Sequence, residues 1–334
     1  MEKIAWIMGY SCIYWNDVIK ILAVFGAVFC FLALCFKEGR AAAAMVFVPL
    51  AVMSSLMLSR LTHWYFRPEQ YESLLVALTD LGRGEFALMG AFAGCFLAVV
   101  FVRLVGLTKN LPEFLDCLSL AGAFGIGLGR LSAFFDGSCR GMLLPEVYGL
   151  PWVAGVVNPV SGVTEYRLAT FLLQAMAAGG MFLALLVWYL VKQKNRKDGD
   201  TALMFLLLYG ASQVILDSTR YDALVLRSNG FLHAVQLLGS GAMVLTAVIF
   251  SVRLVRAGGW KKWHPALWLA QAGCFSLAGY MEYYVQRHGH EAVFSYTIMG
   301  AALAVFAVLT LLTRYLADRE EKAHNAWLRQ IAVL

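Results

Sequence analysis

The sequence predicts an all-α protein that crosses a membrane about nine times. Hydrophobic residues make up 60% of its 334 residues and charged residues only 14%, a balance that excludes an ordinary soluble globular protein. Apolar segments of about 18 residues recur along the chain, and each is long enough to span a bilayer as a helix. Segments of about ten residues with alternating polarity, which would predict a membrane β-barrel, do not occur in the sequence. We therefore expect a polytopic membrane helix bundle.

Nine apolar segments are the predicted spans, and most follow one another through short connections. The sixth segment is short, and the eighth is the least hydrophobic of the set. The predicted spans are residues 18–36, 41–58, 86–105, 118–135, 168–190, 202–216, 232–252, 266–284 and 293–316.

Basic residues are concentrated on one side of the predicted bundle. They follow the first, third, fifth, seventh and ninth spans, and the positive-inside rule assigns these connections to the cytoplasm. The N-terminus is then outside and the C-terminus cytoplasmic, and the net charge of +6 requires no nucleic-acid partner. The residues that set this orientation are Lys37, Arg40, Arg103, Lys109, Lys192, Lys194, Arg196, Lys197, Arg253, Arg256, Lys261, Lys262, Arg314, Arg319, Lys322 and Arg329.

The seven cysteines predict neither a disulfide framework nor a metal site. Most of them lie inside apolar spans, and they lack the paired spacing of metal ligands. We expect them to be free cysteines that pack in the protein interior. No metal ion is therefore expected.

The fourth span combines a glycine-rich face with an arginine near its outer end. Arg130 follows the glycines, and a polar turn that contains Asp136 and Gly137 comes next. An arginine at this depth is costly unless it snorkels to the headgroups or binds an anion. A guanidinium offers a phosphate two hydrogen bonds, so a lipid-phosphate site at Arg130 is the functional alternative to snorkelling. Glycines that let a neighbouring helix approach closely stand at positions 122, 125, 127 and 129.

Polar residues also follow one face of the sixth span. Tyr209, Gln213, Asp217 and Arg220 are spaced so that a continuous helix would carry them on a single stripe. Such a stripe in a membrane helix predicts an internal cavity that is wet or lined for a lipid. A local ion pair between Asp217 and Arg220 would explain the last two positions equally well. Arg60, which ends the second span, is another arginine at an external membrane boundary.

Two polar residues open the seventh span. His233 and Gln236 stand one helical turn apart, at the predicted external level. A lone histidine at such a place is more often an interfacial hydrogen-bonding residue than a base. We keep both residues as candidates that support the site.

These residues, in this order, resemble the prolipoprotein diacylglyceryl transferase family over about residues 12–252. The resemblance implies a seven-span core in residues 1–252, followed by an additional helix pair and cytoplasmic tail in residues 253–334. It also implies a bacterial inner-membrane protein without a cofactor that moves diacylglycerol from phosphatidylglycerol to a cysteine of a prolipoprotein signal peptide. The residues that carry the resemblance are Arg60, Gly90, Gly94, Asp116, Gly129, Arg130, Phe134, Asp136, Gly137, Tyr209, Arg220, Gly230 and Gln236.

The resemblance implies roles for the candidate residues. Arg60, Arg130 and Arg220 would bind the lipid phosphate, and Arg130, Asp217 and Arg220 would act in catalysis. The phospholipid and the prolipoprotein signal peptide are the implied partners. Residues implied to support the site are Tyr209, Gln213, His233, Gln236 and Asp136.

The chain departs from the family pattern at several chemically important positions. Met89 stands where the family usually has a histidine before paired glycines, and Ala133 where it has asparagine or cysteine. Gln213 replaces the usual arginine of the sixth helix, and Asp217 the usual glutamate. The stretch before the fifth span, residues 164–170, does not match the family's histidine-proline motif.

Three classes of function follow from this pattern. The first is a membrane transferase that acts on a phospholipid, with Asp136, Asp217 or His233 replacing the missing histidine as the base. The second is a catalytically degenerate relative that binds a lipid or a membrane partner. The third is a small-molecule or lipid transporter, which is disfavoured because the sequence has no internal repeat.

The predicted topology is open to a direct test. Reporter fusions at Gly199 and Gly258 should read as cytoplasmic, and a fusion at Pro151 should read as external, because the basic connections lie inside. A cytoplasmic signal at Pro151 would reverse the orientation and place the candidate site on the wrong side of the membrane.

Overall fold

The structure is a computed structural model of the chain. It describes residues 4–8, 11–79, 86–144, 152–157, 162–191, 197–226, 232–288 and 292–333. Several positions used above lie outside the described residues, namely Pro151, Lys192, Lys194, Arg196 and Gly230.

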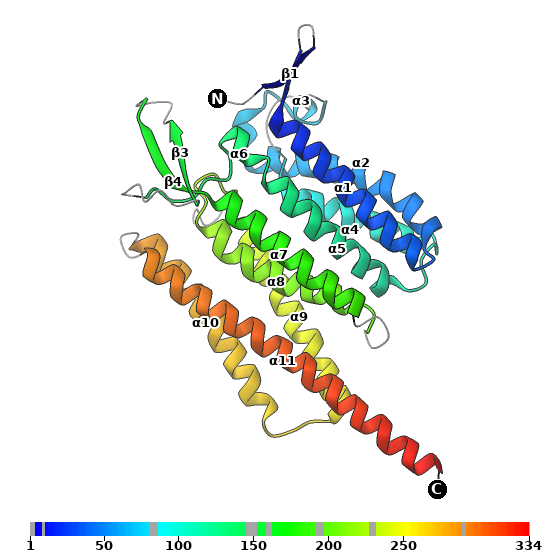
Figure 1. The fold of residues 1–334 in the computed structure, drawn as a ribbon. Coiled ribbons are helices and arrows are strands. Elements are labelled where there is room, and N and C mark those ends of the chain that lie inside the picture. The colour runs from blue at the N-terminus through cyan, green and yellow to red at the C-terminus, as the bar shows by residue number, and fades with distance from the viewer. Residues whose placement is uncertain are drawn as a thin grey trace. The chain divides into compact units, whose positions relative to one another are not determined.

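The described part of the chain is mainly helical, with two short antiparallel hairpins (Figure 1). The elements in chain order are β1 (Ile4–Met8), β2 (Ser11–Tyr14), α1 (Trp15–Lys37), α2 (Ala41–Phe66), η1 (Pro68–Gln70), α3 (Leu74–Thr79), α4 (Leu88–Leu104), α5 (Leu111–Arg130), α6 (Ala133–Asp136), β3 (Val153–Val157), β4 (Thr164–Leu168), α7 (Thr170–Val191), α8 (Asp200–Ser218), α9 (Ala234–Gly258), α10 (His264–Arg287) and α11 (Ala292–Val333).

Each predicted span is a helix, so the prediction of an all-α polytopic membrane bundle is confirmed. Within the described residues, seven helices are long and apolar enough to cross a membrane: α1, α2, α5, α7, α8, α9 and α11. Helix α4 is apolar but has only 17 residues, and α10 corresponds to the least hydrophobic segment. Helix α5 begins at Leu111, seven residues before the predicted start, because Pro112 fits a first helical turn.

The long connection after the fourth span contains an antiparallel hairpin. Strands β3 and β4 pair within it, with Val153 opposite Leu168 and Val157 opposite Thr164. Branched side chains such as those of Val153 and Val157 favour extended backbone.

The chain divides into two compact units. One contains Met1–Phe205 and Arg220–Val235, and the other contains Leu206–Thr219 and Gln236–Leu334. The sequence-based boundary at residue 252 follows the family resemblance and stays a prediction.

Close packing of α2 on α4 shapes the first unit. A Cβ atom at Gly94 would stand 2.3 Å from the backbone nitrogen of Ser55, and one at Gly90 would stand 2.3 Å from a backbone oxygen of α2. The hydroxyl of Ser54 donates to the carbonyl of Gly94 at 2.9 Å, and that of Ser55 donates to Ala91 at 2.9 Å. Small residues at both surfaces therefore allow backbone contact and interhelical hydrogen bonds.

Helix α5 packs between α1 and α7 in the same unit (Figure 1). A Cβ atom at Gly125 would approach Ala27 of α1 to 2.8 Å, and one at Gly127 would stand 3.3 Å from the backbone nitrogen of Gly179 in α7. The glycine-rich face predicted for this helix thus packs against two neighbouring helices. Fully buried Asp116 accepts hydrogen bonds from the backbone N–H groups of Gly199 and Ala202 at 3.0 and 2.8 Å. This carboxylate caps the first turn of α8.

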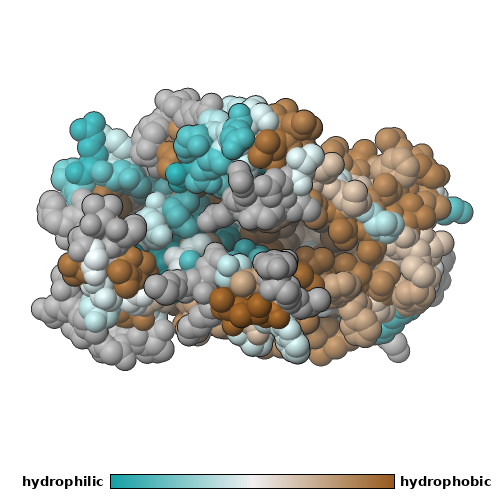
Figure 2. Space-filling view, turned by 90° about the horizontal axis from the view of Figure 1, so that it is seen from above, coloured by the Kyte–Doolittle hydropathy of each residue, from teal (hydrophilic) through white to brown (hydrophobic). Residues whose placement is uncertain are grey.

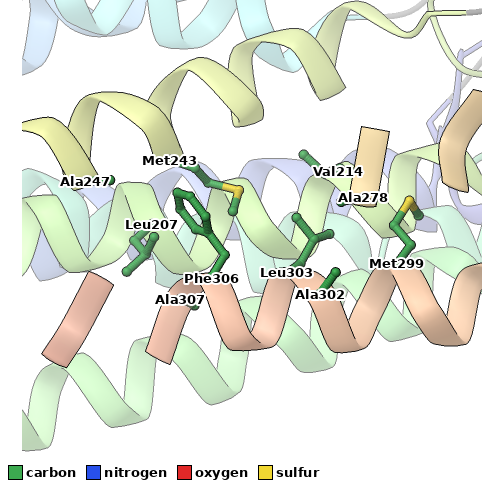
Figure 3. Close-up of a cluster of buried hydrophobic side chains, with 10 residues drawn as sticks. All are labelled: Leu207, Val214, Met243, Ala247, Ala278, Met299, Ala302, Leu303, Phe306 and Ala307. Carbon is green, nitrogen blue, oxygen red and sulfur yellow. The ribbon is translucent and has the colours of Figure 1, made fainter. Parts of the chain in front are cut away.

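The core of the second unit joins α8, α9, α10 and α11 (Figure 3). Its buried side chains are Leu207, Val214, Met243, Ala247, Ala278, Met299, Ala302, Leu303, Phe306 and Ala307. Helices α8 and α9 approach closely where a Cβ atom at Gly210 would stand 2.5 Å from the carbonyl oxygen of Gly239.

The α2–α4 contact predicts the outcome of a glycine substitution. Gly94→Ala should lower the midpoint of thermal unfolding in detergent, because the new methyl group overlaps the backbone of α2. Overpacking of this kind costs about 1–3 kcal/mol. Gly180→Ala in α7 is the matched control, since nothing lies within 4 Å of its Cβ position. Equal midpoints for the two variants would contradict the contact.

Candidate functional site

A polar turn follows the glycine-rich helix and orders the residues after Arg130. Helix α6 ends at Asp136 and is capped by Gly137, whose φ of 78° is left-handed and favours glycine. Oδ1 of Asp136 accepts hydrogen bonds from the backbone N–H and the hydroxyl of Ser138, at 2.8 and 2.7 Å. The ammonium group of Lys20 lies 3.8 Å from the other oxygen of Asp136. Asp136 therefore stabilises the turn and lies beside a cation from α1.

Two of the predicted phosphate ligands, Arg130 and Arg220, are linked through this turn. Nη1 of Arg130 donates to Sγ of Cys139 at 3.2 Å. The backbone N–H of Cys139 donates to Oδ2 of Asp222 at 2.7 Å, and Oδ1 of Asp222 accepts from Nε of Arg220 at 3.0 Å. Residue Gly141 also forms an antiparallel bridge with Arg220. The structure therefore brings the two arginines into one cluster.

Arg140 is a member of this cluster that the sequence analysis did not nominate. Its side chain lies over the ring of Phe171, with 4.4 Å between the guanidinium carbon and the ring centre, and Nη2 donates to the carbonyl of Ala133 at 3.4 Å. The residue is only 6% exposed, and Nε and Nη1 have no hydrogen-bond partner among the described residues. We call Arg130, Cys139, Arg140, Arg220 and Asp222 the arginine cluster.

The charge of Arg140 is the notable property of this cluster. Burial lowers the pKa of its guanidinium, while the nearby carboxylates of Asp136 and Asp222 raise that pKa. Arginine nevertheless stays protonated in proteins. A buried cation with two guanidinium nitrogens that donate no hydrogen bond is unfavourable by itself, and a bound anion would relieve that cost.

The feature of the sequence that could have identified Arg140 as a site residue is its position in the polar turn. Hydropathy draws attention to arginines at the ends of apolar spans, whereas Arg140 lies ten positions beyond Arg130 in a connection. Its neighbour Gly141 is pinned, because its N–H donates to the carbonyl of Leu168 at 2.7 Å and its Cβ position lies 2.4 Å from Oγ1 of Thr170. Burial of a loop arginine by such long-range contacts is invisible to span-based reasoning.

The predicted stripe on the sixth span is interrupted. Tyr209, Gln213 and Asp217 lie on α8 and are buried, with at most 7% exposure. Helix α8 ends at Ser218, so Arg220 lies beyond the helix and does not continue its face. Arg220 forms an ion pair with Asp222 at 3.0 Å and belongs to the other compact unit.

His233 and Gln236 are both buried, but their surroundings differ. His233 precedes α9 and forms a backbone bridge with Val225. Nε2 of Gln236, in the first turn of α9, donates to the carbonyl of Val214 in α8 at 3.0 Å. Gln236 thus holds α9 against α8, while His233 belongs to the unit that contains the arginine cluster.

Arg60 lies in a different group of residues. It is 1% exposed, and its Nε donates to the carbonyl of Ala77 in α3 at 2.9 Å. Its guanidinium carbon lies 5.2 Å from the ring centre of Tyr71 and 5.1 Å from that of Phe86. The hydroxyl of Tyr71 also contacts Nδ1 of His63 at 2.7 Å. These contacts hold the segment after α2 against that helix, and phosphate binding by Arg60 stays a prediction.

The family of the chain is decided by comparison with known sequences. The sequence profile of the family described as prolipoprotein diacylglyceryl transferase matches residues 3–253. The chain belongs to the prolipoprotein diacylglyceryl transferase family. The arginine cluster therefore lies within the part of the chain that this family shares.

Individual relatives are distant but cover most of the matched region. A protein of Finegoldia magna named phosphatidylglycerol–prolipoprotein diacylglyceryl transferase is 26% identical over 208 residues, which are 62% of this chain and 75% of the relative. A Clostridium botulinum protein with the same name is 22% identical over 259 residues, or 77% of this chain and 98% of the relative. A third, from Bordetella avium, is 29% identical over 158 residues, or 47% and 56%.

Helices α10 and α11 lie beyond the matched region, yet they contact a family helix. The hydroxyl of Ser218, the last residue of α8, donates to Oε2 of Glu282 in α10 at 2.6 Å. The hydroxyl of Tyr296 in α11 donates to the carbonyl of Ser218 at 3.2 Å. Nε2 of Gln286 donates to the other oxygen of Glu282 at 3.3 Å. Within the second unit, the added helices are therefore hydrogen-bonded to the residue next to Asp217.

No metal centre is evident in the described ranges, where no group of three or more histidine, cysteine, aspartate and glutamate side chains is arranged to hold an ion. The seven cysteines are free.

In the view from above, hydrophilic residues gather toward one side and hydrophobic residues cover the other side (Figure 2).

The unused donors of Arg140 predict an effect of phosphate on stability. Inorganic phosphate should raise the midpoint of thermal unfolding relative to chloride at equal ionic strength, because it would accept hydrogen bonds from the cluster. Arg140→Gln should remove most of that increase, since a hydrogen bond to a charged group contributes about 1.5–3 kcal/mol. Arg287→Gln, at an exposed arginine, is the control. A phosphate effect that survives Arg140→Gln would contradict the assignment.

Proposed function

We propose that this membrane protein transfers diacylglycerol from phosphatidylglycerol to the cysteine thiol of a prolipoprotein. Membership in the family supports the reaction class, and relatives named phosphatidylglycerol–prolipoprotein diacylglyceryl transferase support the two substrates. The observation that carries the proposal is the arginine cluster, in which Arg130 and Arg220 are linked to a polar turn that itself carries Arg140.

The proposed chemistry requires an anion site more than any other feature. The thiolate sulfur of the acceptor attacks the glycerol carbon, a C–S bond forms, and the C–O bond to the phosphate breaks. The electron pair of that bond leaves with glycerol phosphate, whose charge the guanidinium groups would stabilise. Arg130 and Arg140 are well suited to this role, because both are held by the turn before any ligand binds.

The turn also compensates in part for one departure from the family pattern. Ala133 replaces the usual polar residue and is 2% exposed at the start of α6. Arg140 donates to the carbonyl of this same residue. In our proposal Arg140 supplies at this place the polar group that Ala133 does not have.

The residue that removes the thiol proton is less clearly defined than the residues that would bind the phosphate. Met89 cannot accept a proton, and Asp136 is bound to Ser138 and lies beside Lys20. Asp217 and His233 remain the proposed bases, and both are buried. A positioned base typically contributes about 10²–10⁴ in rate. We therefore propose a transferase with weak or altered activity, and a lipid-binding relative without catalysis as the second candidate, favoured by Met89 and Gln213.

The proposed reaction takes place at the outer face of the bacterial inner membrane. The bundle and the bacterial relatives identify a multi-pass membrane protein. The external N-terminus and cytoplasmic C-terminus, which the basic connections predict, would place the arginine cluster on the outer side.

Complementation tests the proposal. In cells depleted of their own transferase, this chain should restore lipoprotein maturation partly, and Arg130→Ala should abolish that rescue by removing a phosphate ligand. Arg287→Ala should rescue as well as the unaltered chain. Maturation would be followed by the mobility and mass of a reporter lipoprotein.

Each outcome of this experiment decides between the candidates. Full rescue that depends on Arg130 would show that the missing histidine matters less than we propose. The absence of rescue, with phosphatidylglycerol still bound in an Arg130-dependent manner, would support the lipid-binding relative. Rescue that persists in Arg130→Ala would refute the role of the cluster.

A further inference from the structure

A second candidate ligand site lies wholly within the second compact unit. A groove of about 700 Å³ runs between α9 and α10 and reaches one residue of α11. None of the residues predicted for the transferase site lines it. Its larger side chains are mostly apolar: Val244, Val248, Val252, Trp268, Phe275 and Phe306.

Small side chains leave the space that forms this groove. Ala247 and Ser251 line it from α9, and Ala272 and Ser276 line it from α10. Each pair is spaced by four residues and therefore lies on one helix face. The hydroxyl of Ser251 donates to the carbonyl of Ala247 on its own helix at 2.7 Å, so this serine adds little polarity to the groove wall.

One end of the groove carries two hydrogen-bond donors that the described residues do not satisfy. Arg256 lines the groove near the end of α9, is exposed, and has no ion pair or hydrogen bond within the described ranges. Nε1 of Trp268, in the second turn of α10, is buried without a partner there. By contrast, Lys261 in the loop between these helices is paired with Glu320 at 2.5 Å. The guanidinium of Arg256 is thus an unpaired charge in the groove lining.

The dimensions of the groove fit a lipid chain. From Val244 to Arg256 the groove extends about 18 Å along α9 at 1.5 Å per residue. That length is close to one leaflet, half of the roughly 30 Å hydrocarbon core. The groove volume of about 700 Å³ falls within the usual range for small ligands.

We propose that this groove binds an anionic phospholipid. An acyl chain lies between α9 and α10, and the phosphate accepts hydrogen bonds from Arg256 and from the indole N–H of Trp268. The loop between the helices carries Trp260 and Trp263, and tryptophan marks the headgroup level. The positive-inside rule assigns this end, and hence the lipid, to the cytoplasmic leaflet.

Native mass spectrometry of the full chain tests the proposal. The protein is delipidated in detergent and exposed to phosphatidylglycerol or phosphatidylcholine with identical acyl chains. We expect retention of phosphatidylglycerol, about tenfold weaker in Arg256→Gln because a charge-assisted contact is lost. Lys262→Gln removes the same charge from the adjacent loop, away from the groove lining, and should retain the lipid.

A second pair of variants tests the groove itself. Ala272→Phe fills the space for the acyl chain and should abolish retention, whereas Ala270→Phe, at an exposed position of α10 outside the groove lining, should not. All of these variants are made in an Arg130→Ala background, in which the proposed transferase site has lost a phosphate ligand. The lipid that is retained then reports on the groove, and a failure of the proposed transferase function leaves this test unchanged. Equal retention of both lipids, or equal loss in Arg256→Gln and Lys262→Gln, would overturn the proposal. A dimer that Ala272→Phe dissociates would overturn it in favour of a second copy of the chain.

Discussion

A polar backbone group without a partner is expensive inside a membrane, and this constraint governs how the helices begin, end and pack. Asp116 supplies an acceptor to two amides at the start of α8, although it comes from the second turn of α5. Serines of α2 satisfy carbonyl groups of α4. Asp222 does the same for the amide of Cys139 in the turn after α6. In each case a charged or hydroxyl side chain of one segment forms a hydrogen bond with the backbone of another segment.

Similar residues at similar positions have acquired different surroundings. Arg60 and Arg130 both stand at predicted external ends of spans, and hydropathy treats them alike. The guanidinium of Arg60 lies near two aromatic rings and donates to a carbonyl of the following short helix. The Nε atom of Arg130 has no hydrogen-bond partner in the described ranges. This difference makes the arginine cluster, more than the surroundings of Arg60, a place where a ligand would complete the hydrogen bonding.

Much of the fold was predictable because membrane spans are defined by local composition. Nine apolar segments became helices, and the glycines of the fourth span pack as expected. The early start of α5 was missed because Glu113 and Asp116 make its first turns polar, and only tertiary contacts satisfy that aspartate. The β3–β4 hairpin is hard to predict because glycines and prolines dominate the sequence around it. Arg140 was missed because its burial depends on Phe171 and the carbonyl of Ala133, which the spacing of charges cannot reveal.

The hydrogen bonds of Ser218 have a consequence for how the added helices relate to the family helices. If α10 and α11 were removed, the hydroxyl of Ser218 would lose Glu282 and its carbonyl would lose the phenol of Tyr296. Substitutions at Ser218 and at Glu282 or Tyr296 should therefore be energetically coupled.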